Sequence, residues 1–378
     1  MLTHRRLMSR RPGLARLLAV SSAAFALVVT SASATNARTS VTIHQSATTQ
    51  TAGKAAARPF ASTVRRAGPA SCRDLRPSVK VSPHINFRYR IGATLCRPLI
   101  QRHHRVLQIL LPGIGNDRRY WDINYRPGTY SYVRAAARAG VTTLNTDRLG
   151  VGTSDTPARK ITVPADAFVL HQLVQRARRG NYGNFGRIVI GGFSAGGAVA
   201  IMEASIYRDA DAVLVEDFMH TPGPALPGLA GSLYDARTDP VIARPSLPAG
   251  YLTTKPGTRE NVFISPAFAE PELVTLDEQT KSINSAAELP GVGAVLGDRA
   301  LSRRINVPVL LVQGQLDPFF CSDPACSALQ KESAFYGPAA HLKKLLVPSA
   351  AHAVNEHRVA PLVNRIVADW TYRSSQSH

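Results

Sequence analysis

The sequence lacks acidic residues at its start and lacks, in the same region, an apolar run long enough to cross a membrane. No Asp or Glu occurs in the first 70 residues. The apolar stretch from Leu17 to Thr30 has 14 residues, whereas a helix that spans a bilayer needs about 20. We therefore favour a segment that is removed from the chain over an uncleaved membrane anchor.

Residues 1–34 have the pattern of a secretory signal peptide. Five arginines make the start of this segment cationic: Arg5, Arg6, Arg10, Arg11 and Arg16. The apolar stretch follows, and Ala32-Ser33-Ala34 supplies the small residues that signal peptidase accepts. We expect cleavage after Ala34 and a secreted, extracellular protein. Ser9-Arg10-Arg11 is compatible with twin-arginine export, so the export route stays open.

The basic excess of the chain is concentrated at this end. Residues 35–70 are rich in Ser, Thr, Ala and Arg and contain few large apolar residues, which predicts a flexible basic tail. The formal charge of +20 falls to +10 after residue 70, where 35 Lys and Arg face 25 Asp and Glu. Such a surface allows weak association with anionic cell-surface polymers. We favour a solvated surface and expect no specific nucleic-acid partner.

A Cys-x-x-Cys motif is also missing, and no histidine lies close to a cysteine pair, so we expect no metal site. The four cysteines are an even number in a chain expected to be exported, which predicts disulfides. Pairing Cys72 with Cys96 and Cys321 with Cys326 closes the two most local loops, and we favour it over the other two pairings.

From residue 71 onward the sequence predicts one α/β domain, residues 71–378. Apolar runs typical of strands buried on both faces of a parallel sheet lie at Val106–Leu111, Val141–Asn145, Arg187–Gly191, Ala212–Val215, Val307–Val312 and Lys344–Val347. Helical patterns separate these runs, as expected for a sheet covered on both sides. Residues from about 220 to 304 interrupt the alternation, are rich in Pro and Gly, and contain one helical pattern near Pro271–Ser285. We interpret them as an inserted cap.

The strongest chemical signal is Gly192-Phe193-Ser194-Ala195-Gly196, which follows a strand and precedes a helix. In this context Gly-x-Ser-x-Gly forms a sharp turn that presents the serine hydroxyl clear of the sheet. A serine needs a base to become nucleophilic, and the base needs an orienting acid. Asp317 follows one predicted strand and His352 follows the last one, so both belong at the carboxyl edge of the sheet with Ser194. His357 lies one turn farther on and is the rival base.

The order Ser, Asp, His, together with Asp147-Arg148-Leu149-Gly150-Val151-Gly152-Thr153-Ser154, resembles the α/β-hydrolase superfamily over Val106–Trp370. The resemblance implies an α/β-hydrolase fold, with a mostly parallel central sheet, helices on both faces and an inserted cap. Some members place the acid one strand earlier, which makes Asp217 the alternative acid.

The resemblance also implies an oxyanion hole formed by the backbone N–H groups of Ile114 and Ala195. Members of the superfamily usually carry a histidine before the glycine of this loop, where the present chain has Pro112. Because the donor is a backbone amide beyond that glycine, the hole does not depend on the histidine side chain.

These residues predict a secreted serine hydrolase, esterase-like or lipase-like, that cleaves a small-molecule or lipid carboxylic ester through an acyl-enzyme and needs no cofactor. Amidase, peptidase, lactonase or acyltransferase chemistry would use the same triad. A basic secreted binding protein on an inactive scaffold is the non-enzymatic alternative. The sequence leaves the acyl and alcohol groups, the cap structure and the oligomeric state open.

Overall fold

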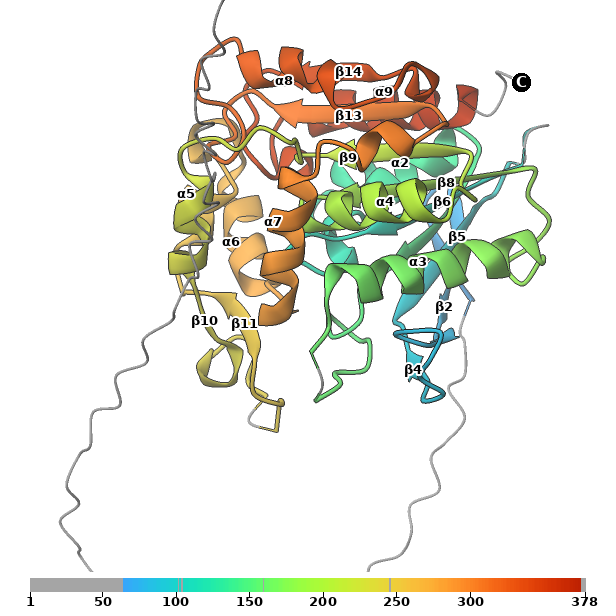
Figure 1. Cartoon of the computed structure of the whole chain (residues 1–378), viewed down its shortest axis with the longest axis horizontal. Coiled ribbons are helices and arrows are strands. Elements are labelled where there is room, and N and C mark those ends of the chain that lie inside the picture. The colour runs from blue at the N-terminus through green and yellow to red at the C-terminus, as the bar shows by residue number, and fades with distance from the viewer. Residues whose placement is uncertain (1–63, 101, 103–104, 159, 245, 375–378) are drawn as a thin grey trace, which may run out of the picture. The chain divides into compact units, whose positions relative to one another are not determined.

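The computed structural model describes residues 64–100, 102, 105–158, 160–244 and 246–374 (Figure 1). The predicted signal peptide and residues 35–63 of the predicted tail lie outside the described residues. Among the residues that are described, no helix combines the length and apolar character needed to cross a membrane.

A nine-stranded sheet forms the centre of the fold (Figure 1). Its strands, in spatial order, are β1 (Val64–Ala67), β2 (Ala70–Leu75), β5 (Ala93–Pro98), β7 (Val141–Thr146), β6 (Val106–Leu111), β8 (Arg187–Phe193), β9 (Ala212–Glu216), β13 (Val309–Gly314) and β14 (Lys343–Val347). The strands from β7 to β14 run parallel, whereas β1, β2 and β5 pair antiparallel. This mostly parallel arrangement confirms the predicted fold class.

Helices cover both faces of this sheet, and the burial of the strands reflects it. Every residue of β6, β7, β9 and β13 is buried, as expected for parallel strands packed on two sides. The helices that pack against the sheet are α2 (Tyr132–Arg138), α3 (Val163–Arg178), α4 (Ala195–Ile206) and α9 (Ala360–Arg373). Helix α3 packs beside α4, and α2 beside α9. The carboxyl edge of the parallel strands is left for loops.

The start of the described chain differs from the prediction. Residues 64–70, which we assigned to the flexible tail, form β1 and the turn into β2, and β1 adds an edge strand to the sheet. The apolar side chains that mark a buried strand are few here, since an edge strand is held largely by backbone hydrogen bonds. The Cys72–Cys96 disulfide joins directly paired residues of β2 and β5.

The segment between β9 and β13 forms the inserted cap, whose helices group beside one end of the sheet in Figure 1. It contains a small antiparallel sheet and short helices: β10 (Leu233–Asp235), β11 (Tyr251–Thr254), β12 (Asn284–Ser285), α5 (Arg259–Val262), α6 (Pro271–Gln279) and α7 (Leu289–Gly297). The helix expected near Pro271–Ser285 ends at Gln279, because residues 284–285 pair with β11. Helix α7 escaped prediction because three glycines and a proline disfavour a helix; Gly291 packs closely against Val163.

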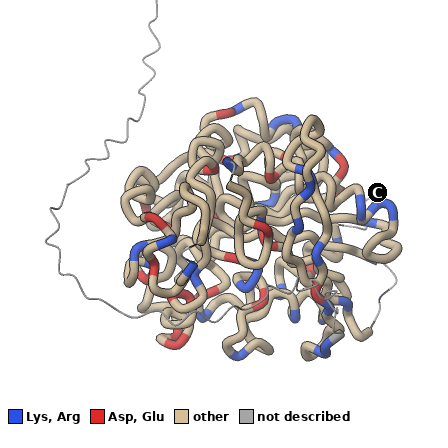
Figure 2. Tube along the Cα trace, turned by 90° about the horizontal axis from the view of Figure 1, so that it is seen from below, with Lys and Arg blue, Asp and Glu red and all other residues tan. Residues whose placement is uncertain are grey.

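The remaining elements are short. They include β3 (Ser78–Val79), β4 (Tyr89–Arg90), α1 (Pro127–Tyr130), α8 (Ser327–Lys331) and several 3₁₀ turns, among them η1 (Arg118–Tyr120) and η9 (Val354–Glu356). Along the trace, Lys and Arg lie interspersed with Asp and Glu in the view of Figure 2. Mixed charge of this kind fits a solvated surface.

Candidate active site

Ser194 lies on a strained turn between β8 and α4. Its φ of 53° places a residue other than glycine in the left-handed region, and its N–H donates to the carbonyl of Glu216 at 2.8 Å. A Cβ at Gly192 would lie 2.0 Å from the carbonyl oxygen of Gly196, and one at Gly196 would lie 2.7 Å from that of Pro112. Only glycine fits at both positions, so strand and helix can meet at an angle that exposes the hydroxyl.

His352 connects this hydroxyl to a carboxylate. Its Nε2 lies 2.8 Å from Ser194 Oγ, and its Nδ1 lies 2.9 Å from Asp317 Oδ2. The carboxylate accepts from Nδ1–H, which leaves Nε2 able to accept the hydroxyl proton. The three side chains come from segments that follow β8, β13 and β14. The structure thus brings together the three residues that the sequence singled out.

Asp317 is held by its own loop as well as by the imidazole. Its Oδ1 accepts the N–H of Phe319 at 2.8 Å, and its Oδ2 accepts the amide of Gln313 at 2.7 Å. Its backbone carbonyl accepts the N–H of Cys321 at 2.8 Å. Cys321 is joined to Cys326 by a disulfide. These contacts fix the direction in which the carboxylate faces His352.

Aromatic rings surround His352. The ring centroid of Phe319 lies 4.8 Å from that of the imidazole, Phe193 lies at 5.1 Å, Phe263 at 5.7 Å and Phe320 at 6.1 Å. Phe263 belongs to the cap, so the cap closes one side of this enclosure. Apolar surroundings exclude water and strengthen the hydrogen bonds on both ring nitrogens.

The loop after β6 runs against the nucleophile. A Cβ at Gly113 would lie 2.9 Å from Ser194 Cβ. Within the described part of the chain, the N–H of Ile114 donates to no backbone or side-chain acceptor. Ala195 is the first residue of α4, where backbone N–H groups have no partner inside the helix. The two backbone groups expected to form the oxyanion hole therefore flank Ser194 and have donor capacity left.

Two buried arginines hold the carbonyl groups of this loop. Arg148 donates from Nε to the carbonyl of Pro112 at 3.0 Å and from Nη2 to that of Gly113 at 3.2 Å. Arg259 in the cap donates to the carbonyl of Gly115 at 3.0 Å. These hydrogen bonds hold the loop in its position beside Ser194.

Both arginines are neutralised by buried carboxylates. Arg148 contacts Asp166 of α3 and Glu288 of the cap, and Arg259 contacts Asp277 of the cap. Burial lowers the pKa of Arg148, and the charge of Asp166 opposes that shift. The cap is thereby tied by ion pairs to the loop that borders Ser194.

The alternative acid, Asp217, has no imidazole partner among the described residues. It is fully buried and accepts the N–H of Gly314 at 2.8 Å and that of Val354 at 3.3 Å. Burial first, then the charges of Asp317 and Glu216, raise its pKa well above the ordinary value. The structure gives Asp217 a place beside the site and gives Asp317 the contact with His352.

The alternative base, His357, is also directed elsewhere. Its Nδ1 bonds to the carbonyl of Ala353 at 2.8 Å, and its Nε2 accepts the N–H groups of Ser265 at 3.0 Å and Ala351 at 3.1 Å. Burial lowers its pKa to about 4, so the ring stays neutral. His357 holds the loop that carries His352 against the cap.

Sequence reasoning missed two further buried groups near Ser194. The hydroxyl of Tyr120 donates to Glu216 Oε1 at 2.5 Å, and its ring stacks on Phe193 with centroids 4.0 Å apart. Burial raises the pKa of Glu216 to about 7, and the Tyr120 hydrogen bond partly offsets this rise. The only signal in the sequence was a glutamate at the end of an apolar strand, a position that most often serves packing.

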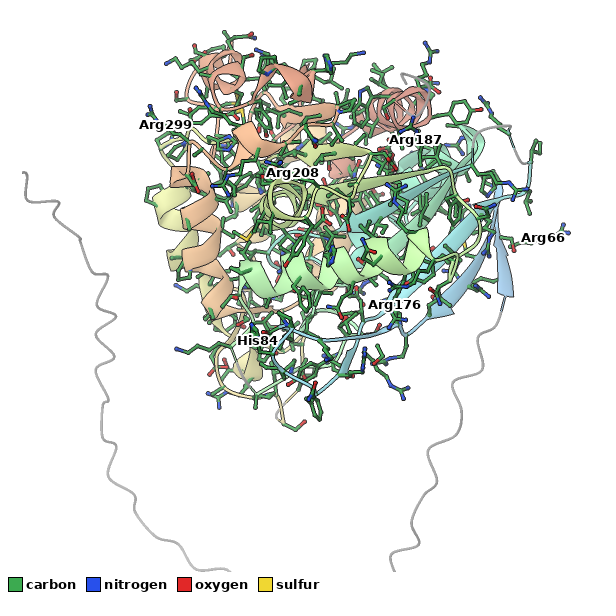
Figure 3. All side chains as sticks on the ribbon, turned by 45° about the vertical axis from the view of Figure 1, so that its right-hand side comes forward. Arg66, His84, Arg176, Arg187, Arg208 and Arg299 are labelled. Carbon is green, nitrogen blue, oxygen red and sulfur yellow. A yellow bond between two sulfur atoms is a disulfide. The ribbon has the colours of Figure 1, made fainter. Side chains whose placement is uncertain are left out.

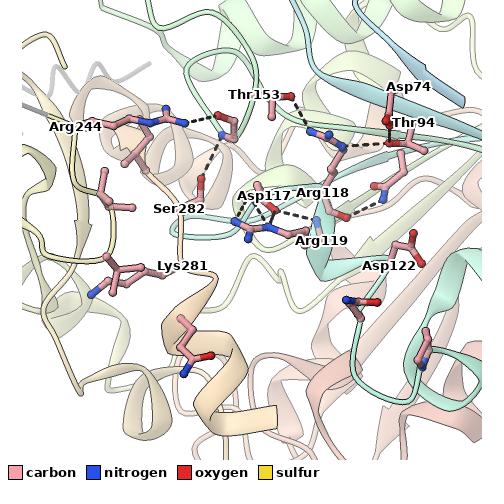
Figure 4. Close-up of a pocket in the computed structure, with 18 of the residues that line it drawn as sticks. Asp74, Thr94, Asp117, Arg118, Arg119, Asp122, Thr153, Arg244, Lys281 and Ser282 are labelled. Atoms are coloured by element: carbon pink, nitrogen blue, oxygen red, sulfur yellow. Dashed lines mark hydrogen bonds and ion pairs between the residues drawn. The ribbon is translucent and has the colours of Figure 1, made fainter. Parts of the chain in front are cut away.

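A separate polar cavity of about 670 Å³ lies between the cap and the strands β2, β5 and β7 (Figure 4). Arg118 spans part of it, in contact with Asp147 and 2.8 Å from Thr153 Oγ1. Arg119 forms an ion pair with Asp117, and Lys281 forms one with Asp239. The residues that line this cavity do not include Ser194 or His352. Three of its six cationic residues, Arg118, Arg119 and Lys281, form ion pairs with acids of the chain.

Comparison with solved structures gives the same fold. An esterase from Thermogutta terrifontis is 18% identical, with a TM-score of 0.52 over 79% of this chain and 99% of the other. A monoacylglycerol lipase from Paleococcus ferrophilus is 14% identical, with a TM-score of 0.53 over 75% and 99%. A monoglyceride lipase from Saccharomyces cerevisiae is 13% identical, with a TM-score of 0.55 over 84% and 99%.

No curated protein matches the sequence of the chain. A family model does match it: residues 108–365 fit the model described as "Alpha/beta hydrolase family". This range includes the turn at Ser194, the cap, and the loops that carry Asp317 and His352. The chain therefore belongs to the alpha/beta hydrolase family.

Proposed function

We propose that the protein hydrolyses carboxylic esters, with Ser194 as nucleophile, His352 as general base and acid, and Asp317 as the residue that orients the imidazole. The observation that carries this proposal is the unbroken succession of hydrogen bonds from Asp317 Oδ2 through His352 to Ser194 Oγ, with steps of 2.9 and 2.8 Å. Distances of this size are those required for a base to remove the hydroxyl proton.

In the proposed reaction His352 Nε2 takes the proton of Ser194 as Oγ attacks the carbonyl carbon of the ester. The N–H groups of Ile114 and Ala195 stabilise the oxyanion of the tetrahedral intermediate. His352 then gives its proton to the departing alcohol, and an acyl-enzyme remains. Water, activated by the same imidazole, releases the carboxylic acid and restores the hydroxyl. Asp317 stabilises the imidazolium form during both steps.

The substrate class rests on family membership and on the relatives. The similar structures are named as an esterase and two monoacylglycerol or monoglyceride lipases, and the aromatic enclosure of His352 suits an apolar acyl chain. We infer a small-molecule or lipid ester as substrate. We also infer secretion after removal of residues 1–34; the two disulfides support this inference because they persist in oxidising compartments.

A fluorophosphonate probe tests the proposal directly, since it reacts with an activated serine. The wild-type protein should be labelled once, and Ser194→Ala should abolish both labelling and the hydrolysis of p-nitrophenyl esters. Ser205→Ala is the matched control, because Ser205 lies in α4, the helix that follows Ser194, and its hydroxyl donates to the carbonyl of Ile201 in the same helix. Labelling that persists in Ser194→Ala would refute the assignment.

Esters of graded acyl length, measured beside aminoacyl amides and lactones, then rank the possible substrates. A wild-type protein that stays unlabelled, hydrolyses none of them and binds polyanions in a strongly salt-dependent manner would instead be a binding protein.

A further inference from the structure

A cluster of three potential metal ligands lies away from Ser194, where α3, α4 and the turn before β9 meet. His171 belongs to α3, Glu203 to the last turn of α4, and Asp209 to the turn that follows. One ligand atom from each lies within 4.8 Å of the others. At 1.5 Å per residue, Glu203 is about 13 Å along α4 from the turn at Ser194. The cluster is thus distinct from the proposed active site.

Glu203 is the unusual member of this cluster. The side chain is fully buried, and neither carboxylate oxygen accepts a hydrogen bond from the part of the chain that the structure describes. The ion pairs of the described residues also leave Glu203 without a cation. A buried carboxylate normally carries compensating hydrogen bonds or a counter-charge, because its desolvation is costly. Glu203 therefore lacks a compensating donor or cation among the described residues.

The other two ligands are held in place by their neighbours. The imidazole of His171 stacks on Tyr207 with ring centroids 4.1 Å apart, and its Nδ1 lies 2.8 Å from Asp209 Oδ2. The amide of Gln175 donates to the same oxygen at 2.6 Å. Such outer contacts are those that orient metal ligands in known sites.

The nearby arginines do not neutralise the cluster. Arg178 and Arg187 both pair with Asp211, at 2.7 and 3.6 Å. Arg208 is exposed at the end of α4 (Figure 3). No Lys or Arg side chain among the described residues therefore pairs with the carboxylate of Glu203 or with that of Asp209.

We propose that His171 Nδ1, Glu203 and Asp209 bind one Zn²⁺ ion. One imidazole nitrogen and two carboxylate oxygens form a donor set that zinc accepts, with a water molecule completing a tetrahedral shell. The charge of the ion would balance both carboxylates, and the ion would supply the partner that Glu203 lacks. It would also tie α3 to the end of α4 and to the turn before β9, which makes its role structural. The sequence predicted no metal because it has no Cys-x-x-Cys motif and no histidine close to a cysteine pair; the ligands proposed here, residues 171, 203 and 209, include no cysteine.

The competing explanation is a shared proton. Burial, together with the adjacent Asp209, raises the pKa of Glu203 well above its ordinary value, so a protonated Glu203 could donate to Asp209. The two explanations differ in what a chelator and an added ion do to the protein, because a shared proton needs no metal.

The test uses the full chain, treated with EDTA and then freed of it by buffer exchange. Isothermal titration with Zn²⁺ should give a stoichiometry of about one, and thermal unfolding should shift upward by about 5 °C at roughly 100 times Kd. Glu203→Gln should abolish both effects. His171→Phe, which keeps a ring stacked on Tyr207 but removes the ligand nitrogen, should abolish them as well.

His84→Ala is the control for adventitious binding, because His84 is exposed in the loop between β3 and β4 (Figure 3); it should leave the titration unchanged. The proposal is overturned if the wild-type protein shows no zinc-dependent shift, or if the shift survives in Glu203→Gln. Hydrolysis of p-nitrophenyl esters is measured on the same samples. A protein that binds zinc as expected but hydrolyses no ester would contradict the function proposed for Ser194 and not the zinc site.

Discussion

Strands β9 and β13 are parallel neighbours in the sheet, and each is followed by a fully buried aspartate at its carboxyl end. Asp217 comes directly after β9, and Asp317 comes three residues beyond β13. The amide of Gln313 donates to both carboxylates, at 3.3 and 2.7 Å. Among the described residues their surroundings differ in one respect: Asp317 also accepts from His352, whereas the other donors to Asp217 are backbone N–H groups.

The difference shows that the partner decides the role of a buried acid at this edge. Burial and two neighbouring acids raise the pKa of Asp217, which favours its neutral form and leaves little electrostatic effect on the site. The carboxylate of Asp317 is turned toward an imidazole that becomes cationic in the proposed reaction, so its charge acts where charge develops. Variants near these two acids can therefore show whether Asp217 and Asp317 differ in role as their partners indicate.

The largest expected effect comes from changing the two acids separately. Asp317→Asn should lower kcat for a p-nitrophenyl ester about 10⁴-fold, because an amide no longer selects the Nδ1–H tautomer or stabilises the imidazolium. Asp217→Asn should stay within about tenfold of the wild-type kcat, since it is two contacts removed from the reacting atoms. Circular dichroism and thermal unfolding of both variants check that the fold is retained. Equal losses of kcat in two folded variants would contradict the comparison.

The next-largest effect is a change of folding stability with pH, and it concerns Glu216, the residue before Asp217. Its pKa is raised by burial from the ordinary 4.5 to about 7, so the folded state keeps a proton that the unfolded chain has already lost. Its contribution to stability is therefore full below about pH 4.5 and is lost as pH rises through 7. The loss is on the order of 3 kcal/mol.

Urea unfolding at pH 4.5 and at pH 7.5 measures this loss. Glu216→Gln cannot ionise and still accepts the hydroxyl of Tyr120, so the stability of the variant should fall less between the two pH values than that of the wild type. Asp166, whose pKa burial raises to about 6, contributes equally to both proteins and cancels. Parallel pH profiles of the two proteins would show that Glu216 titrates normally.

The sequence was enough to predict those parts of the site that depend on neighbouring residues and on the succession of strands along the chain. Gly192 and Gly196 predicted the turn because a side chain at either position would collide with backbone. Asp317 and His352 were predictable because each follows an apolar run that had to be a buried strand. The carboxyl ends of parallel strands meet at one edge, so chain position implied spatial proximity.

What escaped prediction depends on contacts between distant segments. The pairing of Arg148 with Glu288 of the cap joins residues 140 positions apart, and no pattern near either residue indicates it. Residues 64–67 pair with β2 through backbone groups that every residue carries. The three side chains proposed to bind zinc come from two helices and a turn, and only packing brings them together.

A third test concerns the buried Arg148 and asks whether its partners, the carbonyl groups of the loop beside Ser194, determine its role. Lysine keeps the charge but cannot reach the carbonyls of Pro112 and Gly113 at once, because its ammonium is a single point. Arg148→Lys should therefore lower kcat roughly 10²-fold, close to the loss of one oxyanion donor, with little change in KM for a small ester. Arg358→Lys is the control, since Arg358 also donates to a backbone carbonyl but is exposed. If both variants keep wild-type kcat, the buried arginine does not position the loop.

The smallest effect concerns the disulfide in the loop after β13, a crosslink that distinguishes this loop from the one after β9. The Cys321–Cys326 disulfide closes a short loop whose first cysteine donates its N–H to the carbonyl of Asp317. Replacing both cysteines with serine should cost about 2 kcal/mol of unfolding free energy and should lower kcat several-fold, because the loop that aims the carboxylate gains freedom. The Cys72–Cys96 pair offers the matched control: it lies between β2 and β5, so its double serine variant should lose stability yet keep kcat. A Cys321–Cys326 variant with unchanged kcat and Tm would mean that the hydrogen bonds from Phe319 and Gln313 hold Asp317 without help.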